Sequence, residues 1–172
     1  MFKINDVVVY GAQGVCKIVA FDEQRIDGIK KKYFVLKPQD DRGATFYVPT
    51  WNEKALAKMR KVMTKNDVDD LIDSMPGKTP TWIANENERK ETYKKILANG
   101  NHAAIISMIQ AIYLHKKEWE AEGKRLHMSD EHFMKDAEQL LYNEWQYVLN
   151  VDKAGLMAYI FERLENNSIP TE

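Results

Sequence analysis

The chain has 172 residues, a mass of 20.0 kDa and a single cysteine. This length suits one domain or two small ones, each with a modest core. Cys16 cannot form an internal disulfide, so a reducing cytoplasm is the expected compartment. We find no run of about 18 apolar residues, and residues 1–6 lack the long apolar stretch of a secretory signal. The sequence therefore predicts neither a transmembrane helix nor an exported protein.

Charge is distributed unevenly along the chain. Residues 1–63 hold 12 Lys and Arg against 7 Asp and Glu, a net charge of +5, whereas residues 64–172 hold 13 against 19, a net charge of −6. Within the second part, residues 86–125 carry +2 and residues 126–172 carry −6. The pattern excludes a uniformly basic nucleic-acid binder. Any DNA contact is expected to be local, or to depend on a partner for its affinity.

The first sixty residues have the pattern of short strands separated by tight turns. The run Ile26-Asp27-Gly28 predicts a tight hairpin turn, because Gly28 can adopt positive φ. Four or five short strands of this kind indicate a small antiparallel barrel of the Tudor or SH3-like type, whose closure removes exposed edges apart from one kept for a partner. The expected strands are 7–10, 15–21, 32–37 and 45–48.

A helical pattern begins at Thr64, a plausible N-cap with an acid three residues later. Pro76 to Pro80 ends that first helix and is the expected hinge. Further helices are expected at 86–98, at 102–121, at 130–149 with Ser129 as cap, and after Asp152. The predicted class is therefore α+β, with a β-barrel at 1–63, a helix and hinge at 64–80, and an all-α bundle at 81–172.

Common catalytic and metal-binding patterns are missing from the sequence. The four histidines lack the paired helical spacing of zinc proteases, and one cysteine cannot build a cysteine zinc site. Residues 11–14 are not followed by the Gly-Lys-Ser/Thr of a phosphate loop, and no G-x-S-x-G elbow occurs. We predict no catalytic residue, no metal and no cofactor. An enzyme with a dispersed site is the least favoured class.

Basic side chains recur at helical spacing in the second half. Arg89 and Lys90 precede Lys94 and Lys95 by about one turn, so the four can form a ladder along DNA phosphates. Asn85 could add a hydrogen bond. The alternative is a solvated surface whose cations pair with neighbouring glutamates. A second basic strip would comprise Lys116, Lys117, Lys124 and Arg125.

Several passages, in order, resemble one family. They are the opening run 1–10 with Gly14-Val15, the strand 32–37 with Val48-Pro49, the 99–101 helix break and the long helix 105–117. Together they are similar to the CarD/CdnL family of bacterial transcription regulators. The first domain is also similar to the polymerase-interacting domain of the transcription-repair coupling factor. The helical second half favours the CarD/CdnL family.

The resemblance implies a non-enzymatic factor that joins RNA polymerase to promoter DNA. The barrel would dock on the polymerase β subunit by adding its sheet edge to a strand there. The helical domain would contact DNA at the upstream edge of the opening bubble and stabilise the open complex. The matching docking positions are Gln24, Arg25, Ile26, Asp27 and Tyr47.

The resemblance also implies an aromatic wedge in the minor groove. The family's tryptophan position falls here on Glu86, and Trp82, about one helical turn earlier, is the nearest candidate. Trp82 could instead pack against the bundle. A second function class is a polymerase-bound adaptor whose acidic bundle recruits another protein rather than DNA. We expect a monomer, or a domain-swapped dimer, located in the cytoplasm with polymerase at the nucleoid.

Overall fold

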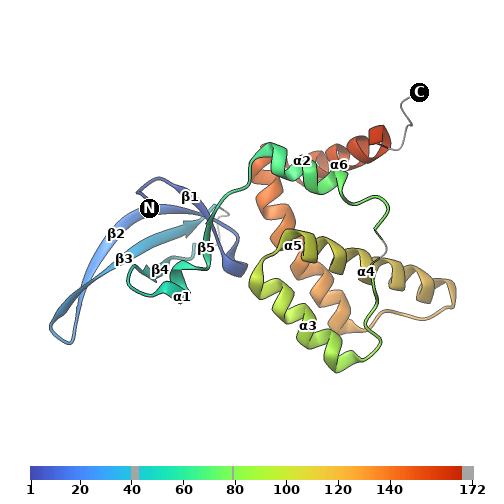
Figure 1. Cartoon of the computed structure of the whole chain (residues 1–172), viewed down its shortest axis with the longest axis horizontal. Helices are drawn as coiled ribbons and strands as arrows, with labels where there is room; N and C mark the ends of the chain where they lie inside the picture. Colours follow the sequence, from blue (N-terminus) through green and yellow to red (C-terminus); the bar gives the residue numbers. More distant parts are fainter. Residues whose placement is uncertain (40–42, 79, 168–172) are drawn as a thin grey trace. The chain divides into compact units, whose positions relative to one another are not determined.

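The computed structural model describes residues 1–39, 43–78 and 80–167. The chain divides into two compact units, Met1–Met63 and Thr64–Glu172. The first unit is a β-sheet with two short helical segments, and the second consists of helices (Figure 1). The predicted α+β class is confirmed.

The first unit is built on one antiparallel sheet of five strands. In chain order they are β1 (Val7–Tyr10), β2 (Val15–Ile26), β3 (Ile29–Pro38), β4 (Phe46–Pro49) and β5 (Met59–Lys61). A short 3-10 helix, η1 (Gly11–Gln13), links β1 to β2, and α1 (Glu53–Leu56) lies between β4 and β5. The order across the sheet is β4-β3-β2-β1-β5, which makes β4 and β5 the two edges.

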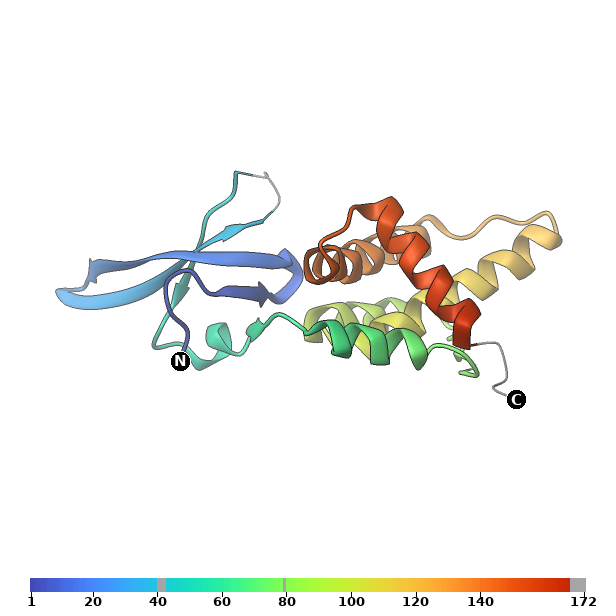
Figure 2. The same cartoon turned by 90° about the horizontal axis from the view of Figure 1, so that it is seen from above.

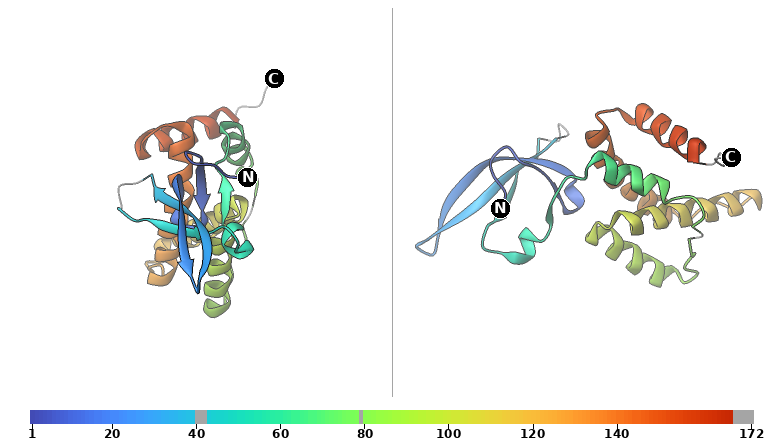
Figure 3. Two further views of the ribbon diagram at one scale, coloured as in Figure 1. Left: turned by 90° about the vertical axis from the view of Figure 1, so that its left-hand side faces the viewer. Right: turned by 45° about the horizontal axis from the view of Figure 1, so that its top comes forward.

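The predicted closure into a barrel is wrong, because within the described residues the sheet stays open. Its edge strands have only four and three residues, whereas β2 and β3 have twelve and ten. The long β2–β3 hairpin (Figures 1 and 3) ends in a turn where Asp27 and Gly28 have φ of 52° and 78°. Positive φ at both turn positions matches the right-handed strand twist, so both strands run on to the turn.

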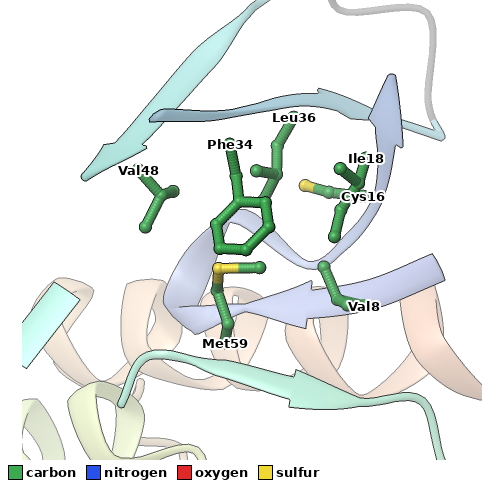
Figure 4. Packing of buried hydrophobic residues seen from close by; sticks show 7 residues of the cluster. All are labelled: Val8, Cys16, Ile18, Phe34, Leu36, Val48 and Met59. Carbon is green, nitrogen blue, oxygen red and sulfur yellow. The ribbon is translucent and has the colours of Figure 1, made fainter. Parts of the chain in front are cut away.

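The core of this unit lies on one face of the sheet (Figure 4). Ile18 and Leu36 are fully buried at its centre, and Phe34 stacks edge-on with Phe2 from the N-terminal segment. Cys16 is also fully buried here. The cluster comprises Val8, Cys16, Ile18, Phe34, Leu36, Val48 and Met59.

The second unit consists of α2 (Lys65–Asp73), α3 (Glu86–Asn99), α4 (His102–Ala121), α5 (Met128–Leu149) and α6 (Lys153–Asn167). Helix α6 lies against α2 (Figure 2), where Tyr159 donates to Asp69 at 2.5 Å and Arg163 makes two hydrogen bonds to Asp73. None of the described helices is long and apolar enough to cross a membrane.

Polar caps fix where the helices begin. Thr64 forms a full capping box with Asp67, and the side-chain oxygens of Asn85 and Asn101 accept from Glu88 and Ala104 N–H groups. The prediction that Ser129 caps α5 is wrong. The helix starts two residues earlier, at Met128, with His127 in the N-cap position and no side-chain cap bond.

Candidate functional site

The hydrogen-bond pattern shows which backbone groups of the edge strand β4 point away from β3. The Thr50 N–H donates to the Lys32 carbonyl at 3.1 Å, and hydrogen-bonded pairs alternate along an antiparallel ladder. Val48, two residues before Thr50, pairs with Phe34, so the N–H and C=O of Val48 face β3. The N–H and C=O of Tyr47, which pairs with Val35, therefore face outward. Pro49 also faces outward, where a missing N–H costs no ladder bond. Tyr47 therefore supplies the outward N–H of β4.

The predicted hairpin residues are all exposed but do not share one face. Side chains alternate across a strand, so Gln24 and Ile26 lie on the face opposite Arg25. Gln24 donates to Asp22 at 2.9 Å, and Asp27 occupies the turn. The structure therefore brings Gln24 and Ile26 to the side of the sheet that carries Tyr47.

That side of the sheet carries an exposed apolar patch that the sequence reasoning missed. Ile29 is 63% exposed, Tyr47 51% and Trp51 47%. Tyr33 packs edge-on against Trp51 with ring centroids 4.9 Å apart, and the Lys31 ammonium lies 5.3 Å from the Trp51 ring centroid. The period-two sequence Ile29, Lys31, Tyr33 was the available signal. An apolar patch beside a free strand edge suits a protein partner.

The prediction that Arg89 belongs to an exposed basic ladder is wrong. Its side chain is 2% exposed, and its Nε and Nη2 donate to the two oxygens of the fully buried Asp130, both at 2.8 Å. The Nη1 donates to the carbonyls of Ile83 and Ala84 at 2.9 and 3.4 Å. Its hydrogen bonds to Asp130 raise the pKa of Arg89. Arg89 thus holds the helical unit together and is not available to phosphates.

The lysines of the two predicted basic strips are mostly paired with local acids. The Lys90 ammonium nitrogen lies 2.6 Å from a carboxylate oxygen of Glu86, and that of Lys94 lies 3.0 Å from one of Glu91. In the second strip, Lys116 lies 3.9 Å from Glu120 and Lys124 lies 2.7 Å from Glu122. Such surface pairs are worth about 0–1 kcal/mol, so the lysines can exchange them for phosphates at small cost. Within the described part of the chain, Lys95, Lys117 and Arg125 make no ion pair.

Trp82 and Asn85 are both engaged within the helical unit. The Trp82 ring stacks on His115, with centroids 3.7 Å apart and an interplanar angle of 13°, and the Arg89 guanidinium carbon lies 4.4 Å from the Trp82 centroid. The Asn85 side-chain oxygen caps α3 by accepting from the Glu88 N–H at 3.0 Å. Trp82 was considered either as a wedge in the minor groove or as a residue packed against the bundle. In this structure it packs against the bundle.

Comparison with known families identifies the first unit. A family model described as the CarD-like/TRCF RID domain matches residues 2–63, nearly the whole of Met1–Met63. The matched domain is an RNA polymerase-interacting domain and a protein-interaction domain rather than a catalytic one. A group of three or more His, Cys, Asp or Glu that could hold a metal ion does not occur in the part of the chain that the structure describes.

Proposed function

Since residues 2–63 belong to the CarD-like/TRCF RID family of polymerase-interacting domains, we propose that the protein is a transcription regulator that binds the RNA polymerase β subunit through the free edge of β4. The observation that carries this proposal is the outward-facing Tyr47 N–H and C=O on β4, next to the exposed apolar patch. A partner strand would pair with this edge, and its side chains would meet the patch. The helical unit would then contact promoter DNA and stabilise the open complex.

Replacing Tyr47 by Pro is expected to weaken binding to bacterial RNA polymerase by at least about tenfold, or about 1.4 kcal/mol. Proline removes the outward N–H without breaking a ladder bond to β3, and edge strands tolerate it. The measurement is a titration of the labelled full chain with core polymerase, with circular dichroism as a check of the fold. Tyr47→Val is the matched control, because it changes the side chain but keeps the N–H. A folded proline variant that binds like wild type would rule out strand addition at β4.

DNA contact by the helical unit rests on the exposed lysines. Removing the charges of Lys90, Lys94 and Lys95 together is expected to shorten the lifetime of the promoter open complex severalfold, because each phosphate contact releases counterions. The measurement is open-complex decay with the cognate polymerase at two salt concentrations. Lys135, exposed on α5, gives a control variant outside the two basic strips. An unchanged lifetime with full polymerase binding would remove the DNA role.

The adaptor function remains the second candidate because of a specific observation. Four of the lysines proposed to contact DNA already have acidic neighbours within 4 Å, and Arg89 is buried. If the charge variants leave the open complex unchanged, the helical unit would act on a protein bound near polymerase. Polymerase binding through β4 is common to both candidates.

A further inference from the structure

The segment Pro80–Asn85, here called the strap, is fastened to the helical unit by Arg89. The Arg89 guanidinium links α5 to the strap. It donates two hydrogen bonds to Asp130 on α5 and two to the strap carbonyls of Ile83 and Ala84. Trp82 lies in the middle of the strap and packs under the same guanidinium. The position of Trp82 therefore depends on the groups that cover its ring.

Trp82 is covered on both faces of its indole. The His115 ring lies parallel to it at 3.7 Å, and the Arg89 guanidinium carbon lies over it at 4.4 Å. Two groups this close to one ring centroid cannot occupy the same face, so His115 and Arg89 lie on opposite sides. A cation over an indole is attractive, and Arg89 already supplies that interaction.

His115 is poorly placed to take up the second ring proton that would make it an imidazolium. Its Nε2 is buried and has no hydrogen-bond partner within the described residues, and the other close ring is Trp119, with centroids 4.5 Å apart. Burial lowers the pKa of His115. An imidazolium would need an acceptor for the Nε2 proton, and burying an unpaired charged donor is costly.

The charged groups around His115 come from three elements. Arg89 on α3 and His127 at the start of α5 lower the pKa of His115, whereas Glu118 on α4 and Asp130 on α5 oppose them. Glu122, just after α4, accepts a hydrogen bond from Lys124. Lys124, and to a smaller extent His115, lower the pKa of Glu122. Asp130 is already bonded at both oxygens by Arg89, so its charge does not offer His115 a hydrogen bond.

We propose that the strap is a proton-sensitive latch, in which protonation of His115 releases Trp82 and the strap from the helical unit. Release lets the imidazolium reach water. It also takes the His115 cation away from the Trp82 ring, over which the Arg89 cation already lies. The latched state favours neutral His115, so the open state binds the additional proton and gains population as the pH falls. Above the ordinary histidine range the latch is closed.

The latch does not rest on the proposed function, since it involves only contacts inside the helical unit. Its consequence concerns what Trp82 can do for any partner. In the closed state both faces of the indole are covered, so it cannot stack on a base or another ring. In the open state the indole becomes an exposed aromatic side chain on the segment that precedes α3.

The test is a nuclear magnetic resonance titration of the full chain between about pH 7.5 and pH 5.5, which spans the ordinary histidine pKa. In wild type, the upfield ring-current shift of the His115 ring protons is expected to disappear as His115 takes up its proton. Over the same pH range, the ring-proton shifts of Trp82 should move toward those of a free indole, because the stacked His115 ring leaves its face. The ring protons of Trp145, which is fully buried, serve as the internal reference.

Two variants separate the latch from general acid loosening. His115→Phe keeps a flat ring against Trp82 without a titratable nitrogen, so the pH response of Trp82 should be lost. His132→Phe removes an exposed histidine of α5 and should respond like wild type. The proposal is overturned if the His115→Phe protein keeps the response, or if wild-type His115 titrates while the Trp82 ring-proton shifts stay unchanged. The wild-type titration alone decides the case if His115→Phe does not fold.

Discussion

Replacing Asp130 by Ala is expected to lower the free energy of unfolding of the helical unit by about 3–5 kcal/mol. Asp130 is fully buried, and both of its oxygens accept from Arg89, which is itself 2% exposed. Without Asp130, the guanidinium stays charged inside the unit and keeps only the carbonyls of Ile83 and Ala84. A buried cation without its counterion costs far more than the net worth of the original pair.

The measurement is urea denaturation of the full chain, followed by the helical circular dichroism signal. Glu91→Ala is the matched control, because Glu91 pairs with Lys94 at 3.0 Å on an exposed surface and should cost less than about 1 kcal/mol. A second comparison is the double variant Arg89→Met, Asp130→Leu, which should recover much of the loss. Equal, small effects of Asp130→Ala and Glu91→Ala would contradict the claim that the buried pair of Arg89 and Asp130 holds this unit together.

Replacing Leu36 by Ala is expected to destabilise the first unit by about 2–5 kcal/mol. Leu36 is fully buried on β3, between Ile18 on β2 and Phe46 on β4 in the register of the sheet. Removing its isobutyl group leaves a cavity between three strands that cannot easily collapse. The loss adds the cost of the cavity to the lost transfer free energy.

Hydrogen exchange of the β2 and β3 amides reports this loss directly, because it follows the first unit without the helical signal. Ile29→Ala is the control on the same strand, since Ile29 is 63% exposed and should change stability by no more than about 0.5 kcal/mol. Exchange in Leu36→Ala that matches wild type would mean that the buried face of the sheet is not the core of this unit.

Local signals were enough to predict most elements of the fold. The run Ile26-Asp27-Gly28 predicted the hairpin turn, and Thr64 with Asp67 predicted the start of α2. Closure of the sheet was not predictable in the same way, because it depends on whether the two edge strands β4 and β5 can pair, which no local pattern in either strand decides. The start of α5 shows the same limit, since Ser129 has the right chemistry for a cap but the chain becomes helical before it.

The candidate site was less predictable, because inward and outward positions on α3 look alike in the sequence. Arg89 and Lys90 are adjacent basic residues, yet one is buried and the other pairs with Glu86 at the surface. The difference comes from Asp130, 41 residues further along the chain, which no local pattern connects to Arg89. His115 was likewise missed as the partner of Trp82, because its role depends on how α4 faces the strap.

Hydrogen exchange of the wild-type chain, alone and saturated with bacterial core RNA polymerase, tests polymerase docking at β4 most directly. We expect the Tyr47 amide, which faces outward, to exchange quickly in the free protein and to become protected by about tenfold or more in the complex. The Val48 amide, which faces β3, should be protected in both states. Fast exchange at Tyr47 in the saturated complex, with protection only elsewhere in the chain, would contradict docking through this edge.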